Sequence, residues 1–188
     1  MRLPRRFAFG CIMLLGLISC GGPGSDLPPL STTSPESYRL GAGDQVRIIT
    51  FGEESLTGEF RVSDSGNIAL PLVGAVHAAG LTSDQLEASV AAALKRAKLV
   101  RDPSVAVEII AYRPIFVLGE VNKPGQYPYQ PGMTVVTAVA VAGGFTYRAI
   151  EGYASVVRTS DGTAIEARAV RQAYVQPGDV ITVFERRF

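Results

Sequence analysis

Apolar and polar positions alternate at strand spacing over much of the first half of the chain after residue 38. Four short segments there are rich in β-branched or aromatic residues and each predicts a strand: residues 46–51, 60–63, 68–70 and 105–110. The turn formers of residues 64–67 predict a hairpin between the second and third segments. Pro71 has no N–H to donate to a ladder, so we expect strand pairing to end there.

Between residues 82 and 97 the apolar spacing changes from that of a strand to that of a helix. Thr82 and Gln85 match a capping box, in which each side chain bonds the backbone N–H of the other residue. Apolar residues then recur every three or four positions, as on one face of a helix. They are Leu86, Val90, Ala93, Leu94 and Ala97. This segment therefore predicts a helix that starts after Thr82.

From residue 115 the pattern predicts a second block of strands with one helix. The continuous apolar run of residues 115–118 is typical of a buried strand. Thr134 is expected to cap a helix that extends to residue 142 and ends at Gly143 and Gly144. This helix has almost no polar face, which predicts burial on several sides, within its own domain or against a neighbouring subunit.

Two further strands are predicted near the end of the chain, and an internal echo suggests a third. Residues 155–158 and 163–166 bracket a turn at residues 160–162. Residues 40–48 resemble residues 175–183, since each has a tight Gly-Asp turn feeding a strand. The last strand is expected to return and pair near the first. Together the elements predict an α+β fold, with a small β-rich domain over residues 38–111 and a second domain over residues 112–188.

The N-terminal residues have the pattern of a signal peptide. Three arginines precede an apolar stretch over residues 7–18, which is shorter than the roughly 20 residues that a membrane-spanning helix needs. The sequence Leu-Ile-Ser-Cys at its end resembles the lipobox of bacterial lipoproteins. That resemblance implies a signal peptide over residues 1–19, cleavage between Ser19 and Cys20, and lipidation of Cys20. The alternative is an ordinary secretory signal with a chance cysteine.

Residues 20–37 read as a flexible tether between the lipid and the folded body. Glycine, proline, serine and threonine dominate, and only Leu27 and Leu30 are available for burial. Such a segment gains too little from burial to offset its ordering entropy, so we expect it to be extended or mobile. Gly21 directly follows Cys20. A residue of this kind at this position resembles the pattern of lipoproteins that are sent on to the outer membrane.

Removal of the signal peptide also changes the charge and the cysteine content. The mature chain has 15 basic and 17 acidic side chains, a net charge of −2. This balance does not favour nucleic-acid binding, which is typical of a strongly basic domain. Cys11 leaves with the signal peptide and Cys20 is the lipidation site, so no disulfide is expected.

Several motifs in order resemble the outer-membrane polysaccharide export proteins, the Wza-like group. Residues 38–44 resemble the opening of the export domain, and residues 62–74 resemble its hairpin. Residues 79–82 resemble the entry to its helix, and residues 102–105 resemble the lead into its last strand. The soluble-ligand-binding β-grasp (SLBB) module that follows is matched by residues 119–127, 131–134 and 142–146. The resemblance therefore implies an export domain with one helix over residues 38–111 and an SLBB-like β-grasp domain over residues 112–188.

The resemblance implies that the protein is part of a conduit for capsular polysaccharide or exopolysaccharide. Members form ring-shaped homo-oligomers beneath the outer membrane and act with an inner-membrane co-polymerase, often paired with a tyrosine kinase. Larger members add a further β-grasp module and a C-terminal amphipathic helix that lines a pore, whereas this chain stops at Phe188. We therefore expect a short member, lipid-anchored in the outer membrane and facing the periplasm, that acts with a separate outer-membrane β-barrel.

No catalytic or metal-binding constellation stands out in the sequence. His77 is the only histidine and has no second histidine or cysteine partner, so neither a metal nor a cofactor is expected. Asp44 and Asp179 each follow a turn glycine, where a carboxylate bonds the local backbone. A glycosidase pair of the two is the disfavoured alternative. The chain is accordingly expected not to be an enzyme.

Exposed polar and aromatic groups of the second block are the candidate polysaccharide contacts, because aromatic rings stack on pyranose rings and cations attract acidic sugars. They are Arg113, Asn122, Lys123, Gln126, Tyr127, Tyr129, Tyr147 and Arg148. The alternative for each tyrosine is packing over strand ends. The alternative function is a monomeric periplasmic ligand-binding or adaptor lipoprotein, and a polysaccharide-modifying enzyme is disfavoured.

Overall fold

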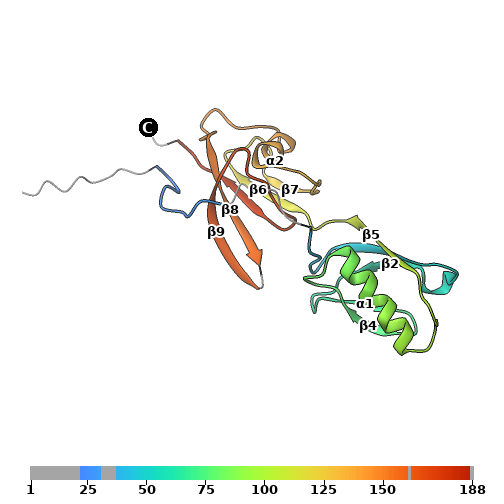
Figure 1. Cartoon of the computed structure of the whole chain (residues 1–188). Helices are drawn as coiled ribbons and strands as arrows, with labels where there is room; N and C mark the ends of the chain where they lie inside the picture. Colours follow the sequence, from blue (N-terminus) through green and yellow to red (C-terminus); the bar gives the residue numbers. More distant parts are fainter. Residues whose placement is uncertain (1–21, 31–36, 161, 187–188) are drawn as a thin grey trace, which may run out of the picture.

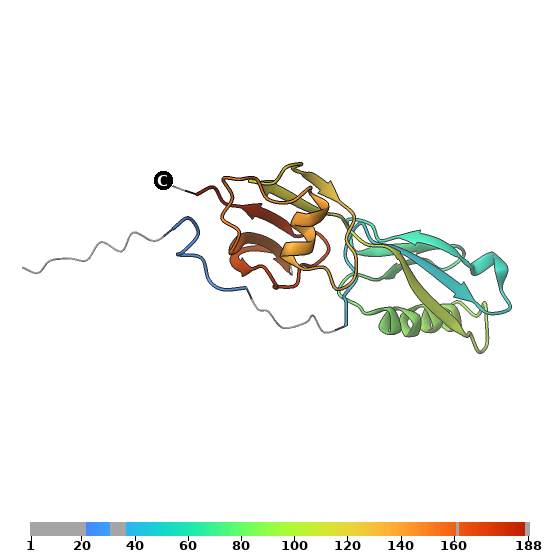
Figure 2. The same cartoon turned by 90° about the horizontal axis from the view of Figure 1, so that it is seen from above.

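Two β-rich domains lie end to end in the computed structural model, which describes residues 22–30, 37–160 and 162–186 (Figure 1). The first domain contains a three-stranded sheet, a two-stranded sheet and helix α1, and the second contains a five-stranded sheet and helix α2. Seen from above, the chain between β5 and β6 joins the two domains (Figure 2). The predicted α+β class is confirmed.

The three-stranded sheet of the first domain has the order β2–β1–β5 and is antiparallel throughout. Its central strand β1 (Gln45–Thr50) lies between β2 (Gly58–Arg61) and β5 (Val105–Ala111). The short 3-10 helix η1 (Glu54–Leu56) connects β1 to β2. Alternate side chains of β1 face the core, in line with the predicted strand.

The hairpin predicted around residues 64–67 has a different pairing in the structure. Strand β3 (Asn67–Leu70) pairs with β4 (Gly74–His77) in a sheet of their own, and not with the strand before the turn. The preceding strand β2 pairs with β1, and β3 takes its partner from the segment after it. β3 ends directly before Pro71, as expected from the missing N–H of proline.

Helix α1 (Ser83–Arg96) covers the first domain and begins as predicted. The Thr82 hydroxyl accepts a hydrogen bond from the Gln85 amide, and the Gln85 side chain accepts one from the Thr82 amide. Its buried side chains are Leu86, Val90, Ala93 and Leu94, which join the core of the first domain. Ala97 lies at the C-cap and is exposed, because the helix has ended by that point.

The five-stranded sheet of the second domain has the order β7–β6–β10–β8–β9. Its strands are β6 (Ile115–Gly119), β7 (Gly125–Tyr127), β8 (Tyr153–Ser160), β9 (Thr163–Val170) and β10 (Val180–Val183). The predicted return of the last strand to the first is wrong. β10 is instead the central strand of this sheet, parallel to β6 and antiparallel to β8, because Ile181 and Val183 are buried in the second core.

Strand β6 is buried on one face only, which differs from the continuous burial predicted for residues 115–118. Ile115 and Val117 are fully buried, whereas Phe116 and Leu118 are 37% and 42% exposed. The run is apolar on both faces, but the second core covers only one of them. The other face of β6 therefore presents apolar side chains to solvent.

Helix α2 (Val135–Val141) packs one face into the second core, and its capping threonine is the predicted Thr134. Gly143 and Gly144 follow the helix with φ angles of +84° and +87°, the left-handed geometry predicted for its end. Within its own domain the helix is buried on one face only, and burial of its other face against a neighbouring subunit stays a prediction. Val141 is 48% exposed, because α2 lies at the surface of the domain.

Residues 22–30 lie against the second domain. The Leu30 amide donates to the Arg168 carbonyl and the Arg168 amide donates to the Pro28 carbonyl, each over 2.7 Å. The Tyr153 hydroxyl donates to the Pro23 carbonyl over 2.9 Å. The segment is not extended throughout, in contrast to the expectation from the sequence, because residues 23–26 form turns in which the Ser25 amide donates to the Gly22 carbonyl. Its last residues are bonded to the free edge of β9, whose unpaired backbone groups are open to a further strand. Ser19 and Cys20 lie outside the described residues.

Candidate functional site at the domain junction

The two Gly-Asp turns of the sequence echo come together between the domains. Gly43 and Gly178 have φ angles of +98° and +90°, which glycine adopts readily. A side-chain oxygen of Asp44 accepts a hydrogen bond from the Gly41 amide over 2.8 Å, and one of Asp179 accepts from the Gln176 amide over 2.7 Å. Strands β1 and β10 start directly after these aspartates, so the predicted turn-to-strand device is present twice.

Each of the two aspartates is fully buried and lies beside an arginine. Arg158 donates to both carboxylate oxygens of Asp179, over 2.7 and 3.0 Å. The backbone amide of Arg113 donates to Asp44 over 2.9 Å, and its side-chain Nε lies 3.4 Å from the same oxygen without the alignment of a hydrogen bond. Because both carboxylates are buried and bonded in this way, neither is open to a substrate.

Residues 112–114 connect the domains and are bonded on both sides. The Arg113 amide donates to Asp44 in the first domain. The Gly178 amide donates to the Pro114 carbonyl over 3.1 Å, and the Phe116 amide donates to the Asp179 carbonyl over 2.9 Å. The two Gly-Asp turns therefore hold the linker from opposite sides.

A row of three tyrosines crosses the junction. The ring centroids of Tyr38 and Tyr112 are 5.1 Å apart and those of Tyr112 and Tyr129 are 5.4 Å apart, both edge to face. The Tyr38 hydroxyl donates to Asp44 over 2.5 Å and accepts from Arg113 over 3.2 Å. Burial, followed by the hydrogen bond to Asp44, raises the pKa of Tyr38 well above its ordinary value.

This shift predicts a loss of stability in alkali. The unfolded phenol ionises near its ordinary pKa of 10.0, whereas the folded protein keeps Tyr38 protonated. The unfolded state therefore binds fewer protons above about pH 10, so the free energy of unfolding falls as the pH rises further. Urea denaturation at several pH values should show this fall, with a shallower slope for Tyr38→Phe. Equal slopes for the two proteins would contradict the assignment to Tyr38.

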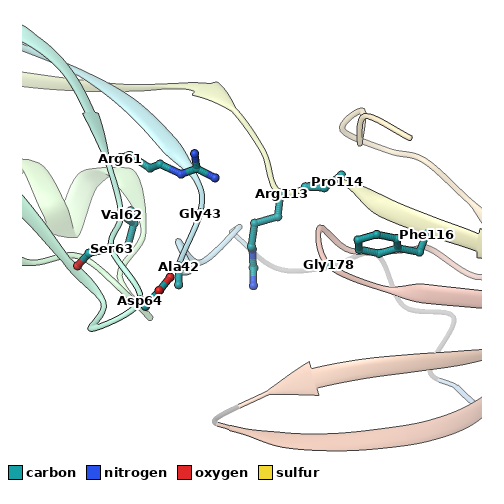
Figure 3. A pocket seen from close by; sticks show the side chains of 10 residues that line it. All are labelled: Ala42, Gly43, Arg61, Val62, Ser63, Asp64, Arg113, Pro114, Phe116 and Gly178. Atoms are coloured by element: carbon teal, nitrogen blue, oxygen red, sulfur yellow. The ribbon is translucent and has the colours of Figure 1, made fainter. Parts of the chain in front are cut away.

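A cleft of about 560 Å³ opens at the same junction (Figure 3). This volume lies within the range of ligand sites, roughly 300–1,000 Å³. The first domain contributes Arg61 at the end of β2 and Asp64 in the turn after it. Arg113 comes from the linker, and Phe116 comes from the exposed face of β6.

The cleft combines charged groups with an exposed aromatic ring. Figure 3 shows the Arg61 guanidinium reaching toward the linker, with Arg113 between the domains and the Phe116 ring beyond it. No ion pair joins Arg61 to any described residue, and the Arg113 side chain is 30% exposed. Such a site can bind an anion and an apolar surface together. Among the described residues, no cluster of His, Cys, Asp or Glu side chains could hold a metal ion.

Of the eight candidate contact residues from the sequence, only Arg113 lines this cleft. Gln126 lies opposite Phe116 in the β6–β7 ladder, and Tyr129 ends the tyrosine row. Tyr147 is 87% exposed, and Arg148 forms an ion pair with Glu185.

The remaining three candidates hold loops of the second domain together. The Asn122 side chain donates to the Gly143 carbonyl over 2.8 Å at the end of α2. The Tyr127 hydroxyl donates to the Lys123 carbonyl over 2.5 Å. Lys123 itself is exposed. Sequence reasoning did not single out Arg61, Asp64 and Phe116. Phe116 lies in the apolar run that predicts a buried strand, and no local signal marks Arg61 or Asp64 as part of a site.

Comparison with known protein families matches both domains. Residues 32–110 match the family described as polysaccharide biosynthesis/export protein, and residues 114–165 match the SLBB domain. The boundary between the two matches falls within the linker that the two Gly-Asp turns hold. Among the described residues, no helix is long and apolar enough to cross a membrane.

Curated proteins with similar sequences are named for polysaccharide production, export and transport. Exopolysaccharide production protein ExoF of Rhizobium meliloti is 34% identical over 61% of this chain and 30% of its own length. EPS I polysaccharide export outer membrane protein EpsA of Ralstonia nicotianae is 28% identical over 85% of this chain and 50% of its own length. Polysialic acid transport protein KpsD of Escherichia coli is 30% identical over 57% of this chain and 19% of its own length. The chain thus spans half or less of each relative.

Proposed function

Because the chain belongs to the polysaccharide export family and carries an SLBB domain, we propose that it is a periplasmic, outer-membrane-anchored part of an export conduit for exopolysaccharide or capsular polysaccharide. Copies of the chain form a ring, and the polymer passes outward through its lumen without chemical change. The protein acts with an inner-membrane co-polymerase, paired with a tyrosine kinase, and with a separate outer-membrane β-barrel.

The observation that carries this proposal is the order of the two family matches. An export domain over residues 32–110 is followed directly by an SLBB domain from residue 114, on either side of a bonded linker. The relatives named for exopolysaccharide production, EPS I export and polysialic acid transport support a polysaccharide as the cargo. The burial of Asp44 and Asp179 supports a role without catalysis, since these aspartates are unavailable as an acid and base pair.

Anchoring at Cys20 is the part of the proposal that rests on the signal pattern. Acyl chains on this cysteine would hold the protein to the membrane, since each buried methylene contributes about 0.8 kcal/mol. The relative EpsA is named an outer membrane protein, which supports the outer membrane as the location. Residues 22–30 lie against the second domain, so an anchor at Cys20 would keep that domain nearest the lipid.

Polymer secretion by complemented deletion cells tests both the function and the anchor. Cells that lack the gene are expected to lose polysaccharide export, and the intact gene should restore it. Cys20→Ser should fail to restore export and should leave the protein unlipidated. Cys11→Ala is the matched control, because that cysteine is removed with the signal peptide, and it should restore export fully. Normal secretion by the deletion cells would end the proposal.

A monomeric ligand-binding or adaptor lipoprotein is the second candidate, because the junction cleft lies within a single copy of the chain. The mass of the lipidated protein in detergent separates the two functions. A ring has the mass of several protomers, whereas an adaptor of this kind has the mass of one. A strictly single-copy protein would therefore favour the adaptor.

A further inference from the structure

We propose that the junction cleft binds an acidic sugar residue, with its carboxylate at Arg61 and Arg113 and one face of its ring against Phe116. The inference rests on the proposed function for the polymer that supplies this sugar. It goes further by assigning both a site and a chemical class of ligand. The evidence for the site is the two arginines, together with the Phe116 ring and the Asp64 carboxylate in the same cleft.

The two arginine side chains lie beside the same turn, at different glycines. The Arg113 guanidinium lies against Gly41, since a Cβ atom placed there would be 2.7 Å from its Cζ and Nη1 atoms. A Cβ atom placed on Gly43 would lie 3.5 Å from Cγ of Arg113 and 4.0 Å from Nη2 of Arg61. Both side chains therefore approach the cleft floor from neighbouring positions. A guanidinium presents paired N–H groups that match the two oxygens of a carboxylate, so two of them beside one floor suit such a ligand.

Arg61 is the group that gives the cleft its preference for an anion. Arg113 lies beside the buried carboxylate of Asp44 and also donates to the Tyr38 hydroxyl, so its charge is largely compensated. Arg61 forms no hydrogen bond or ion pair with any described residue. Its backbone is held in place, because the Gly43 amide donates to the Val62 carbonyl and the Val62 amide donates to the Asp44 carbonyl.

Asp64 makes the site suitable for a sugar rather than for a simple anion. It lines the same cleft as Arg61 but forms no ion pair with it. Carboxylates accept hydrogen bonds from hydroxyl groups. A ligand that carries a carboxylate at one side and hydroxyls at the other can therefore satisfy both residues at once, as a uronic acid does.

Phe116 supplies the apolar surface that a sugar ring needs. Its ring is 37% exposed on β6, and the polar side chain of Gln126 lies opposite it in the ladder. The C–H groups on one face of a pyranose are apolar, so stacking there removes apolar area from water on both partners. Gly178 has no side chain to fill the floor between Phe116 and Arg113.

Calorimetric titration of the purified full-length protein tests the site. The probe is trigalacturonic acid, and its neutral methyl ester is the comparison. The acid is expected to bind and the ester to bind at least about tenfold more weakly, since hydrogen bonds between charged groups are the stronger ones. Arg61→Gln should remove this difference by weakening binding of the acid alone. Phe116→Ala should weaken binding of both.

The matched control is Arg101→Gln, which removes an exposed arginine at the far end of the first domain and should leave both affinities unchanged. Equal affinity of wild-type protein for acid and ester would overturn the inference, as would unchanged binding by Arg61→Gln. Polyglutamate binding as tightly as the acid sugar would also overturn it, because the site would then recognise charge alone. Failure of these titrations while deletion cells still lose export would refute the site and leave the proposed function standing.

Discussion

Replacing Asp179 with alanine is expected to lower the free energy of unfolding by about 3–5 kcal/mol, because it breaks a buried ion pair and leaves one partner behind. Asp179 is 1% exposed and accepts two hydrogen bonds from Arg158. It also accepts the Gln176 amide within its own turn. The substitution would leave these donors without their partner at the entry to the central strand of the second sheet.

Asp102→Ala is the matched control for this prediction. Asp102 forms an ion pair with Lys95, but its side chain is 98% exposed. Exposed pairs contribute about 0–1 kcal/mol, so urea denaturation should show little change. If the two variants lost similar stability, the buried pair would not have the structural weight that we assign to it.

The second large effect is expected at Gly119, where alanine should cost about 3 kcal/mol or more of stability. A Cβ atom there would lie 2.1 Å from the carbonyl oxygen of Val183 in the neighbouring strand β10. That oxygen also accepts the Glu120 amide over 3.0 Å. The φ angle of +80° adds strain of about 1–3 kcal/mol, and overpacking typically adds about 1–3 kcal/mol.

Gly132→Ala separates the strain from the collision. Gly132 lies in the same domain with a φ angle of +81°, but a Cβ atom there would meet nothing within 4 Å. Alanine at this position should cost only the strain of the left-handed backbone, about 1–2 kcal/mol. The difference between the two variants in lost free energy of unfolding, measured by thermal and urea denaturation, should therefore be the cost of the collision with Val183 alone. Equal losses would show that β6 can move away from β10 at little cost.

Features set by a few neighbouring residues could be predicted from the sequence. Both helix starts are fixed by capping side chains three residues apart, at Thr82 and at Thr134. The glycines after α2 and the two Gly-Asp turns also depend on local backbone geometry. Such features depend on hydrogen bonds between residues a few positions apart, so both partners can be identified from the sequence.

Pairings between distant segments could not be predicted in the same way. β10 joins the second sheet because Ile181 and Val183 fit its core, although its turn resembles that before β1. The exposure of Phe116 has a similar cause, since an apolar run does not reveal whether one or both faces of a strand are covered. Either outcome fits the local pattern equally well.

The cleft was beyond local reasoning for the same reason. Arg113 could be named as a candidate from its chemistry, but Arg61 of the first domain joins Arg113 and the nearby Phe116 only when the two domains meet. Arg61 is separated from Arg113 by several elements, and nothing near Arg61 or Phe116 marks a binding site. A site assembled at a junction depends on an arrangement that sequence periodicity does not record.

The linker is held by both Gly-Asp turns, which restricts movement of one domain relative to the other. Bending it would break hydrogen bonds at Asp44 and at Pro114 and would separate the rings of Tyr38 and Tyr112. Neighbouring copies that touched through one domain alone would therefore also set the positions of their other domains.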